Sequence, residues 1–372
     1  MSFFCPEPYK NLSAKTTGKW YPCCISGTDS SKFHNMNVRE HKLLDFYNSD
    51  FMNKLREDQL KGDMSEEVKI NCEKCLIDEQ YGRQSRRLRM IDKYKGEDFS
   101  KLNIDSIKIK HIGNLCNAKC LTCAPSISSY LAQELYDTGE YDGPIVIYDE
   151  VTDTYLEGLK EVIPYTNSIR LVGGEPVINP KTWEFIEWLV KNNATQTQLI
   201  FTTNAKVPFK KNHLKLLDNF ESVKIAVSID AYGERNNYIR YPSPYKKAIK
   251  NTKSYLNVTD NIYISSCIST LNVGYLDELE EDIKSTFPSI PWVIDNIVQY
   301  PHIFRPEILP MEIKEMYLDS SRNAKKFLSL DIDSDIKMFE SMITFLKKKD
   351  KLRNLNLFKL YPEFKRYEKS IY

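Results

Sequence analysis

The sequence lacks an excess of either charge, a long apolar run and an internal repeat. Its 372 residues hold 52 Lys and Arg against 51 Asp and Glu, a formal net charge of +1, which disfavours a dedicated nucleic-acid or polybasic membrane binder. No apolar run approaches the ~18 residues that a transmembrane helix needs. The first residues also lack the basic and apolar segments of a signal peptide. We therefore expect a cytoplasmic protein of about two or three domains.

Cysteine is the informative residue type. Nine cysteines are too few for a disulfide scaffold in a chain of this length. Eight of them lie in the first third of the chain, and Cys267 stands alone. Five form close-spaced sets, Cys72-x2-Cys75 and Cys116-x3-Cys120-x2-Cys123. In a cytosolic protein such spacing indicates metal or redox chemistry rather than cross-linking.

Three segments differ in composition and in the pattern of apolar residues. They are a polar, cysteine-bearing segment (1–100), a segment of alternating strand and helix patterns (101–305) and a helical tail rich in Lys and aromatic residues (306–372). In the first, we expect helices over Val38–Leu60 and Cys75–Met90. In the second, short apolar runs alternate with amphipathic stretches, which predicts βαβ units and a parallel sheet. Periodicity leaves open an incomplete (β/α)6 barrel or an open doubly wound sheet. The expected strands are Ile107–Ile112, Ile169–Val172, Gln198–Thr203, Val223–Ile229, Ile262–Ile268 and Trp292–Val298.

The loop after the first expected strand holds Cys116, Cys120 and Cys123. Three thiolates on one short loop can hold a cubane cluster and leave one of its irons open to a ligand. A tetrahedral zinc site would need a fourth ligand, which this loop does not supply. A zinc site completed from elsewhere, or buried cysteines without metal, are the alternatives.

Polar motifs follow the next strands at their carboxyl ends, where α/β folds build their sites. They are Gly173-Gly174-Glu175-Pro176, Asn204, and Ser228 with Asp230, followed by Arg240. Glycines allow close approach of a backbone to a ligand, and a carboxylate can accept from an ammonium group.

With these motifs in this order, the sequence resembles the radical SAM superfamily over about residues 105–300. The resemblance implies a partial (β/α)6 barrel in which Cys116, Cys120 and Cys123 ligate a 4Fe–4S cluster. The open iron would chelate S-adenosylmethionine (SAM). Thr122 departs from the aromatic residue that many members carry before the third cysteine, which makes the adenine contacts less certain.

The resemblance also implies the residues that contact SAM. Gly173, Gly174 and Glu175 would line the methionine amino end. Ser228 and Arg240 would meet the ribose and carboxylate, with Asn204 nearby. The implied reaction is reductive cleavage of SAM to a 5′-deoxyadenosyl radical that abstracts hydrogen from a substrate, with a one-electron donor such as flavodoxin or ferredoxin.

The N-terminal cysteines form two distant pairs that can fully ligate one metal centre. The spacing Cys5-x12-Gly18-x4-Cys23 resembles the auxiliary-cluster half of SPASM and twitch domains, here placed before the barrel as if permuted. The resemblance implies that Cys5, Cys23, Cys72 and Cys75 hold a second 4Fe–4S cluster that relays electrons. Zinc fits the same four thiolates on chemistry alone. Cys24 could replace Cys23.

Five further residues each allow a functional and a purely structural interpretation. Cys267 is a candidate hydrogen-atom donor to a substrate radical, or a buried core thiol. His111, just before the cluster loop, is a candidate site contact or a packing residue. Lys108, Lys110 and Arg170 lie on expected strands and face either a polar barrel lumen or exposed strand ends.

The substrate stays open at this stage. We favour a peptide or protein side chain, with oxidation or rearrangement of a small metabolite such as a sugar or nucleotide as the alternative. A non-catalytic iron–sulfur or zinc-binding interaction protein is the rival from another class.

Overall fold

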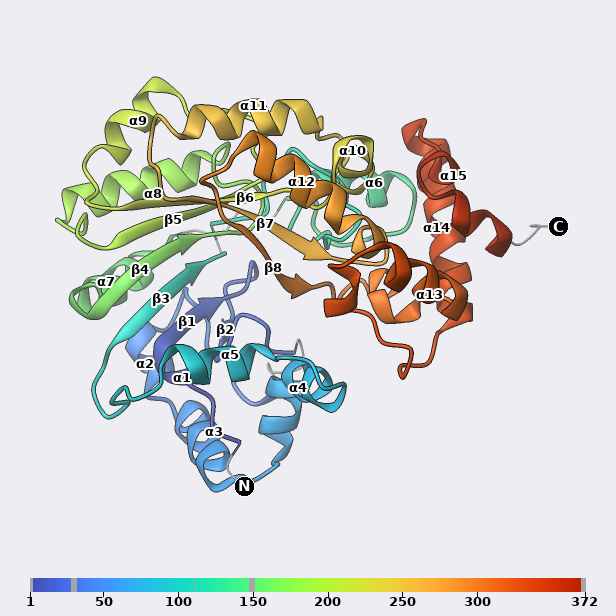
Figure 1. The fold of residues 1–372 in the computed structure, drawn as a ribbon. Coiled ribbons are helices and arrows are strands. Elements are labelled where there is room, and N and C mark those ends of the chain that lie inside the picture. Colours follow the sequence, from blue (N-terminus) through green and yellow to red (C-terminus); the bar gives the residue numbers. More distant parts are fainter. Residues whose placement is uncertain (1–2, 28–31, 111, 147–150, 369–372) are drawn as a thin grey trace. The chain divides into compact units, whose positions relative to one another are not determined.

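The protein is described by a computed structural model that covers residues 3–27, 32–110, 112–146 and 151–368 (Figure 1). His111 lies outside the described residues. The chain divides into two compact units. The first comprises Met1–Cys116, Ser126–Thr203 and Phe209–Ile225; the second comprises Asn117–Pro125, Asn204–Pro208 and Ala226–Tyr372.

The first unit is built on a sheet whose strands follow the order β2-β1-β3-β4-β5. Strand β1 pairs antiparallel with β2 and parallel with β3, and the β3–β4 and β4–β5 pairs are parallel. The strands are β1 (Asn11–Ala14), β2 (Trp20–Tyr21), β3 (Ile104–Ile109), β4 (Thr166–Leu171) and β5 (Gln198–Thr203). The N-terminal segment therefore adds two strands to the same sheet that carries the expected α/β strands.

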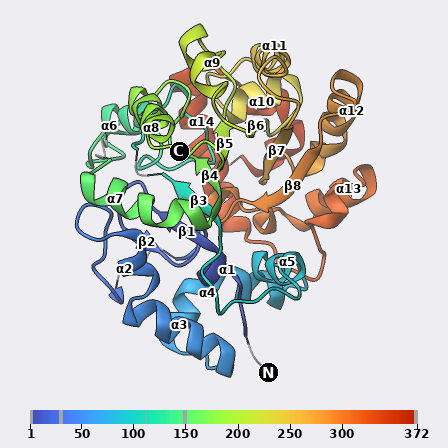
Figure 2. The ribbon, with the colours of Figure 1, turned by 90° about the vertical axis from the view of Figure 1, so that its left-hand side faces the viewer.

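Several helices of the first unit begin at small polar residues whose side chains accept a backbone N–H, which satisfies a donor that the helix leaves unpaired. Ser49, Ser65, Ser128 and Asn179 act in this way. Helices α8 and α9 lie side by side (Figures 1 and 2). The helices are α1 (Glu7–Lys10), α2 (Leu43–Tyr47), α3 (Asp50–Lys61), α4 (Glu66–Gln80), α5 (Arg86–Lys93), α6 (Ser129–Asp137), α7 (Asp153–Val162), α8 (Pro180–Lys191) and α9 (Lys211–Leu217).

Two long helices expected in the N-terminal segment are each divided. The expected helix Val38–Leu60 becomes α2 and α3, because Ser49 leaves the helical conformation and caps α3 through Met52 N–H. The expected helix Cys75–Met90 becomes the end of α4 and the start of α5. Gly82, with a φ of 67°, and the cap Ser85 separate them.

The second unit carries the remaining strands. Strand β6 (Val223–Ser228) enters it from the first unit, and β7 (Ile262–Ile268) pairs in parallel with β8 (Trp292–Ile297). The six strands expected between 101 and 305 are thus all present, and the α/β class with a parallel sheet is confirmed. The helices are α10 (Gly233–Ile239), α11 (Tyr245–Tyr255), α12 (Leu276–Thr286), α13 (Met311–Ser320), α14 (Ile336–Arg353) and α15 (Leu357–Leu360).

The hydrophobic cores show how the predicted segments combine. In the second unit, Phe339, Ile343 and Leu346 of α14 are buried in one cluster with Ile268 at the end of β7. The helical tail therefore shares a core with the strands that precede it. The predicted boundaries at residues 100 and 305 do not coincide with the borders of the two compact units. Each unit contains residues from more than one predicted segment.

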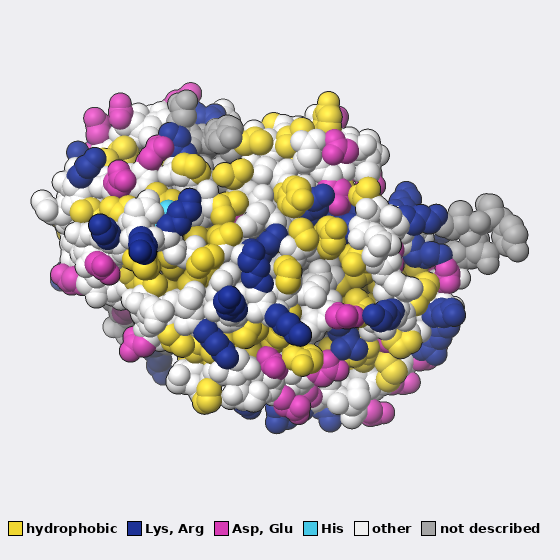
Figure 3. Space-filling view, turned by 90° about the horizontal axis from the view of Figure 1, so that it is seen from above, with side chains coloured by type: hydrophobic (Ala, Val, Ile, Leu, Met, Phe, Trp, Pro, Cys, Tyr) yellow, Lys and Arg dark blue, Asp and Glu magenta, His cyan; other side chains and the backbone are white. Residues whose placement is uncertain are grey.

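The distribution of charged side chains and the hydropathy of the helices agree with the near-neutral net charge and the lack of long apolar runs in the sequence. Figure 3 shows basic and acidic side chains interspersed over the face that it displays. Among the helices that the structure describes, none is long and apolar enough to cross a membrane.

The core of the first unit gives a test of its packing. Phe201 is fully buried and packs on Trp183 and Phe209, with ring centroids 5.8 and 5.4 Å away. Phe201→Ala should lower the free energy of unfolding by about 3–5 kcal/mol, because it leaves a cavity. Tyr165→Ala, at a residue that is 53% exposed, should change it by less than about 0.5 kcal/mol. Denaturant unfolding of both variants measures this, and equal midpoints would contradict the assignment of the core.

Candidate active site and auxiliary metal centre

The first part of the cysteine loop is fixed by backbone hydrogen bonds within the first unit. Cys116 N–H donates to Ser129 Oγ at 3.2 Å, and Ser129 N–H donates to the carbonyl of Asn114 at 2.8 Å. Glu175 N–H donates to the carbonyl of Leu115 at 2.8 Å. The loop is therefore tied both to the start of α6 and to the Gly-Gly-Glu-Pro turn.

Glycine is required in that turn by close packing. A Cβ on Gly174 would lie 2.2 Å from the carbonyl oxygen of Leu115, and one on Gly173 would lie 2.8 Å from that of Lys110. Gly173 also has a φ of 96°, which favours glycine. The two predicted motifs thus meet backbone to backbone, as the order of the strands led us to expect.

Glu175 has a position that the sequence did not disclose. Its side chain is 1% exposed, and its Oε1 accepts hydrogen bonds from Thr203 Oγ1 at 2.7 Å and from Val177 N–H at 3.2 Å. The carboxylate thereby joins the ends of β4 and β5. Thr203 is a functional candidate that sequence reasoning missed, although its place at a strand end was a signal for it.

The second part of the cysteine loop belongs to the second unit. Leu121 N–H donates to the carbonyl of Ile239 at 2.8 Å, and Cys123 N–H donates to that of Cys120 at 3.2 Å. Asn204, expected near SAM, donates from Nδ2 to Asn117 Oδ1 at 2.8 Å. In this structure Asn204 therefore supports the loop directly.

Arg240 is paired with a carboxylate that was not among the predicted site residues. Its guanidinium donates to Asp230 Oδ2 at 2.8 Å, and Asp230 is 1% exposed. Asp230 Oδ1 accepts from Cys267 N–H at 2.8 Å, and the Asp230 carbonyl accepts from Asn272 Nδ2 at 2.7 Å. Since breaking such a buried pair costs about 3–5 kcal/mol, Asp230 fixes Arg240 at the carboxyl end of β6.

Strand alternation fixes which way Cys267 faces. In β7, Ile262, Ile264 and Ile268 are fully buried, whereas Cys267 lies on the opposite, half-buried face. Its register partner on β8, Asn296, is exposed. Cys267 thus lies on the less buried face of β7 and packs against the hydrophobic cluster of the second unit.

The chemistry of the cysteine loop fits an iron–sulfur cluster. Cys116, Cys120 and Cys123 are half-buried, and they form no disulfide with one another or with the other described cysteines. Burial raises the pKa of Cys120, while the nearby guanidinium of Arg240 lowers it. The iron ions of a cluster would offset the cost of burying the thiolate, because they bind the cysteine side chain in its deprotonated form.

The N-terminal cysteines converge on one pocket of the first unit. All four predicted ligands, Cys5, Cys23, Cys72 and Cys75, line it. Gln59 donates from Nε2 to Cys72 Sγ at 3.4 Å. Cys23 is among the described residues that line the pocket, whereas Cys24 is not. This difference favours Cys23 as the ligand.

The pKa values of the thiols in this pocket favour the binding of a cation. Burial raises the pKa values of Cys5, Cys72 and Cys75, that of Cys72 to about 12. Gln59 Oε1, also in the lining, is buried without a hydrogen-bond partner among the described residues. Four converging thiols that are costly to ionise alone fit a metal centre, since ligation supplies the missing positive charge.

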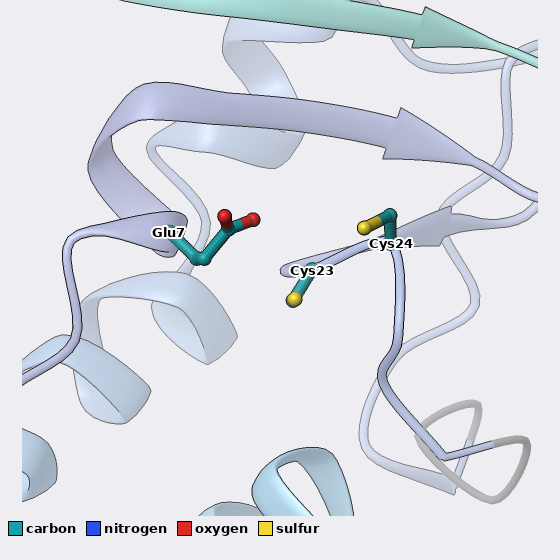
Figure 4. Close-up of side chains that lie close together, drawn as sticks. All are labelled: Glu7, Cys23 and Cys24. Atoms are coloured by element: carbon teal, nitrogen blue, oxygen red, sulfur yellow. The ribbon is translucent and has the colours of Figure 1, made fainter. Parts of the chain in front are cut away.

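A second, smaller group of potential ligands lies beside the pocket. The ligand atoms of Glu7, Cys23 and Cys24 are all within 4.8 Å of one another. Figure 4 shows the three side chains gathered together, with the Cys24 thiol directed toward the Glu7 carboxylate, and the thiols of Cys23 and Cys24 are hydrogen-bonded to each other. Arg86 pairs with Glu7 at 2.7 Å. Glu7 was missed from the sequence because an isolated acidic residue carries no spacing signal.

Comparison with protein families identifies both motifs. Residues 111–287 match the radical SAM superfamily, and residues 5–76 match the SPASM iron–sulfur cluster-binding domain. The chain therefore contains a radical SAM domain, and a SPASM iron–sulfur cluster-binding segment precedes that domain in the sequence. Its cofactors are SAM, the 4Fe–4S cluster of that domain and an auxiliary iron–sulfur cluster.

Solved structures give weaker likenesses. The chain is similar to anSMEcpe with bound AdoMet and the Cp18Cys peptide (18% identity, TM-score 0.39), covering 51% of this chain and 50% of that one. It is also similar to SuiB of Streptococcus suis bound to S-adenosylmethionine (14% identity, TM-score 0.37), covering 86% and 65%. The match spans less than two thirds of either structure, and at these TM-scores it adds nothing to the assignment. No curated protein matches the chain.

Iron counting tests the assignment of the two cysteine sets. Anaerobically reconstituted protein should contain about eight irons per chain, as two 4Fe–4S clusters require. Cys72→Ala should remove about four of them, because its thiol lines the N-terminal pocket, and the matched variant Cys24→Ala should remove none. About four irons with one zinc in the unaltered protein would contradict an auxiliary iron–sulfur cluster.

Proposed function

We propose that this protein cleaves SAM reductively and modifies a peptide or protein side chain. The observation that carries the proposal is the presence in one chain of the radical SAM cysteine loop with its glycine turn and of a pocket lined by four further cysteines. When bound, the cluster and SAM supply a 5′-deoxyadenosyl radical that removes a hydrogen atom from the substrate.

The protein's own contribution is to hold these groups. Cys116, Cys120 and Cys123 would ligate the first cluster, on a loop fixed by backbone hydrogen bonds. Gly173, Gly174 and Glu175 would line the methionine amino end of SAM.

Ser228 and Arg240 would meet the ribose and carboxylate of SAM. The pairing of Arg240 with Asp230 supports this role, because it sets the guanidinium at one place at the end of β6. Asn204 would act nearby through its hydrogen bond to Asn117 in the loop.

The N-terminal centre would act as an electron relay. Ligation by Cys5, Cys23, Cys72 and Cys75 fills every iron position, so no iron would be open to substrate. A relay that accepts an electron from the substrate radical favours net oxidation or cross-linking. The reductant that starts the reaction would be a one-electron donor such as flavodoxin or ferredoxin.

The first test is cleavage of SAM itself. The reduced, reconstituted protein should form 5′-deoxyadenosine from SAM under anaerobic conditions, and Cys120→Ala should abolish this because it removes a ligand of the first cluster. Cys72→Ala should retain it, since Cys72 lines the other pocket. Chromatography of the nucleoside products measures both. If the unaltered, fully loaded protein forms no 5′-deoxyadenosine, even with peptide and metabolite candidates, the proposal is wrong.

Where the substrate radical passes no electron to the N-terminal centre, Cys267 would instead return a hydrogen atom to that radical, and the thiyl radical left on Cys267 would be restored by an electron from the one-electron donor and a proton. Its half-buried place on the more open face of β7 supports this role. Cys267→Ala should then leave 5′-deoxyadenosine formation intact but lower product turnover by at least about tenfold. Mass spectrometry of the product in deuterated buffer would follow the returned hydrogen atom. Full turnover by Cys267→Ala would remove Cys267 from the mechanism.

A further inference from the structure

Gln59 is a polar side chain that is buried against the proposed ligands of the auxiliary centre. It lies near the end of α3, is only 1% exposed and lines the N-terminal pocket together with Cys5, Cys23, Cys72 and Cys75. Its Nε2 donates to Cys72 Sγ at 3.4 Å. A cysteine that ligates iron has lost its proton and can only accept a hydrogen bond, so the amide suits the ligated form of Cys72.

Packing alone does not account for a glutamine at this position. The Gln59 Oε1 is buried and has no hydrogen-bond partner among the described residues. Burial of an unpaired amide oxygen costs stability, which an apolar side chain of similar size would avoid. Leu55, one helical turn earlier, lines the same pocket and is also 1% exposed. This face of α3 therefore accommodates apolar side chains, and the amide of Gln59 is explained by its hydrogen bond to sulfur.

Backbone N–H groups act on two other ligands of the pocket. Burial and the Glu7 carboxylate raise the pKa of Cys5, while a hydrogen bond from the N–H of Glu7 lowers it. Burial also raises the pKa of Cys75, and a hydrogen bond from the N–H of Arg87 lowers it. Arg87 lies in the first turn of α5, where N–H groups have no acceptor within the helix. Three of the four proposed ligands thus receive an N–H donor.

Hydrogen bonds to the sulfurs are one of the factors that set the reduction potential of an iron–sulfur centre. Reduction adds negative charge, so an N–H donor stabilises the reduced state more than the oxidised state and raises the potential. The surroundings strengthen this effect, because Cys5 and Cys75 are each only 7% exposed. The Glu7 carboxylate would act in the opposite direction, but it is paired with Arg86 at 2.7 Å.

We propose that Gln59 is a positioning residue of the auxiliary centre and raises its reduction potential through the hydrogen bond to Cys72. The inference rests on the proposed function and deepens it, because a higher potential favours acceptance of an electron from the substrate. In that step the substrate radical loses one electron to the centre and one proton to solvent. The electron then passes to the oxidised form of the one-electron carrier.

A potentiometric titration followed by electron paramagnetic resonance tests the inference. The reconstituted full chain would carry Cys120→Ala, which removes a ligand of the first cluster and leaves the signal of the auxiliary centre alone. In this parent chain, Gln59→Met removes the N–H donor and keeps the approximate size of the side chain. At the midpoint potential of the parent chain, the ratio of reduced to oxidised centre should fall about tenfold, or about 59 mV for a one-electron couple.

A matched variant separates this hydrogen bond from the general loss of an amide. Gln84→Met makes the same substitution at an exposed residue just before α5, where the Gln84 Nε2 donates to Asp92. It should leave the midpoint potential unchanged. Both variants should match the parent chain in iron content and in unfolding midpoint, because Gln59→Met also removes a buried oxygen that has no partner among the described residues.

Isotope labelling of the parent chain gives a second measurement. Glutamine side-chain amides would carry ¹⁵N, and hyperfine spectroscopy of the reduced centre would detect an amide that is hydrogen-bonded to a ligand sulfur. Among the described residues that line the pocket, Gln59 is the single glutamine. A ¹⁵N coupling is therefore expected. This measurement decides the inference even where Gln59→Met does not retain its irons.

Two results would overturn the inference. One is that Gln59→Met and Gln84→Met have the same midpoint potential, and the other is that the labelled parent chain shows no ¹⁵N coupling. The titration needs neither SAM nor substrate, so a failure of the unaltered protein to form 5′-deoxyadenosine would contradict the proposed function alone. A centre that holds zinc would give no signal and would overturn both the relay and the inference, and the metal count identifies that case.

Discussion

The contact between two backbones is the constraint on which the radical SAM site depends. Gly174 lies so close to the carbonyl of Leu115 that any side chain would collide with it, and Glu175 N–H donates to that same carbonyl. The loop with Cys116 and the turn after β4 are thereby held as one surface. Glu175 extends this bracing to β5 through Thr203. A site that must position a reactive group benefits from such rigidity, because misplacement by about 1 Å can cost about 100-fold in rate.

Burial of groups that carry charge is the second theme of the molecule. The thiols of the N-terminal pocket are held where ionisation is unfavourable. This arrangement is costly unless a bound group of positive charge completes it. The Asp230–Arg240 pair differs, since its two charges already compensate each other.

The N-terminal segment combines these themes. Its loop after β2 brings Cys23 to the auxiliary pocket and Cys24 close to Glu7, while β1 joins the sheet beside β3. A segment that contains the auxiliary metal centre is thus also part of the sheet that carries the radical SAM motifs. Placing such a segment before the domain in sequence is compatible with this packing, because β1 and β3 are parallel neighbours joined by the connecting helices α2 to α5.

The sequence alone determined the features that depend on local spacing or periodicity. The cysteine loop, the glycine turn and the six strands follow from residue spacing and alternation, which act over a few residues. The sequence did not determine the division of the N-terminal helices at Ser49 and Ser85. It also did not disclose the positions of Thr203 and Glu7, or the pairing of Asp230 with Arg240. These features depend on strand register and on which distant segments pack together, and only the tertiary structure decides that, because burial and pairing change the energy of each polar group.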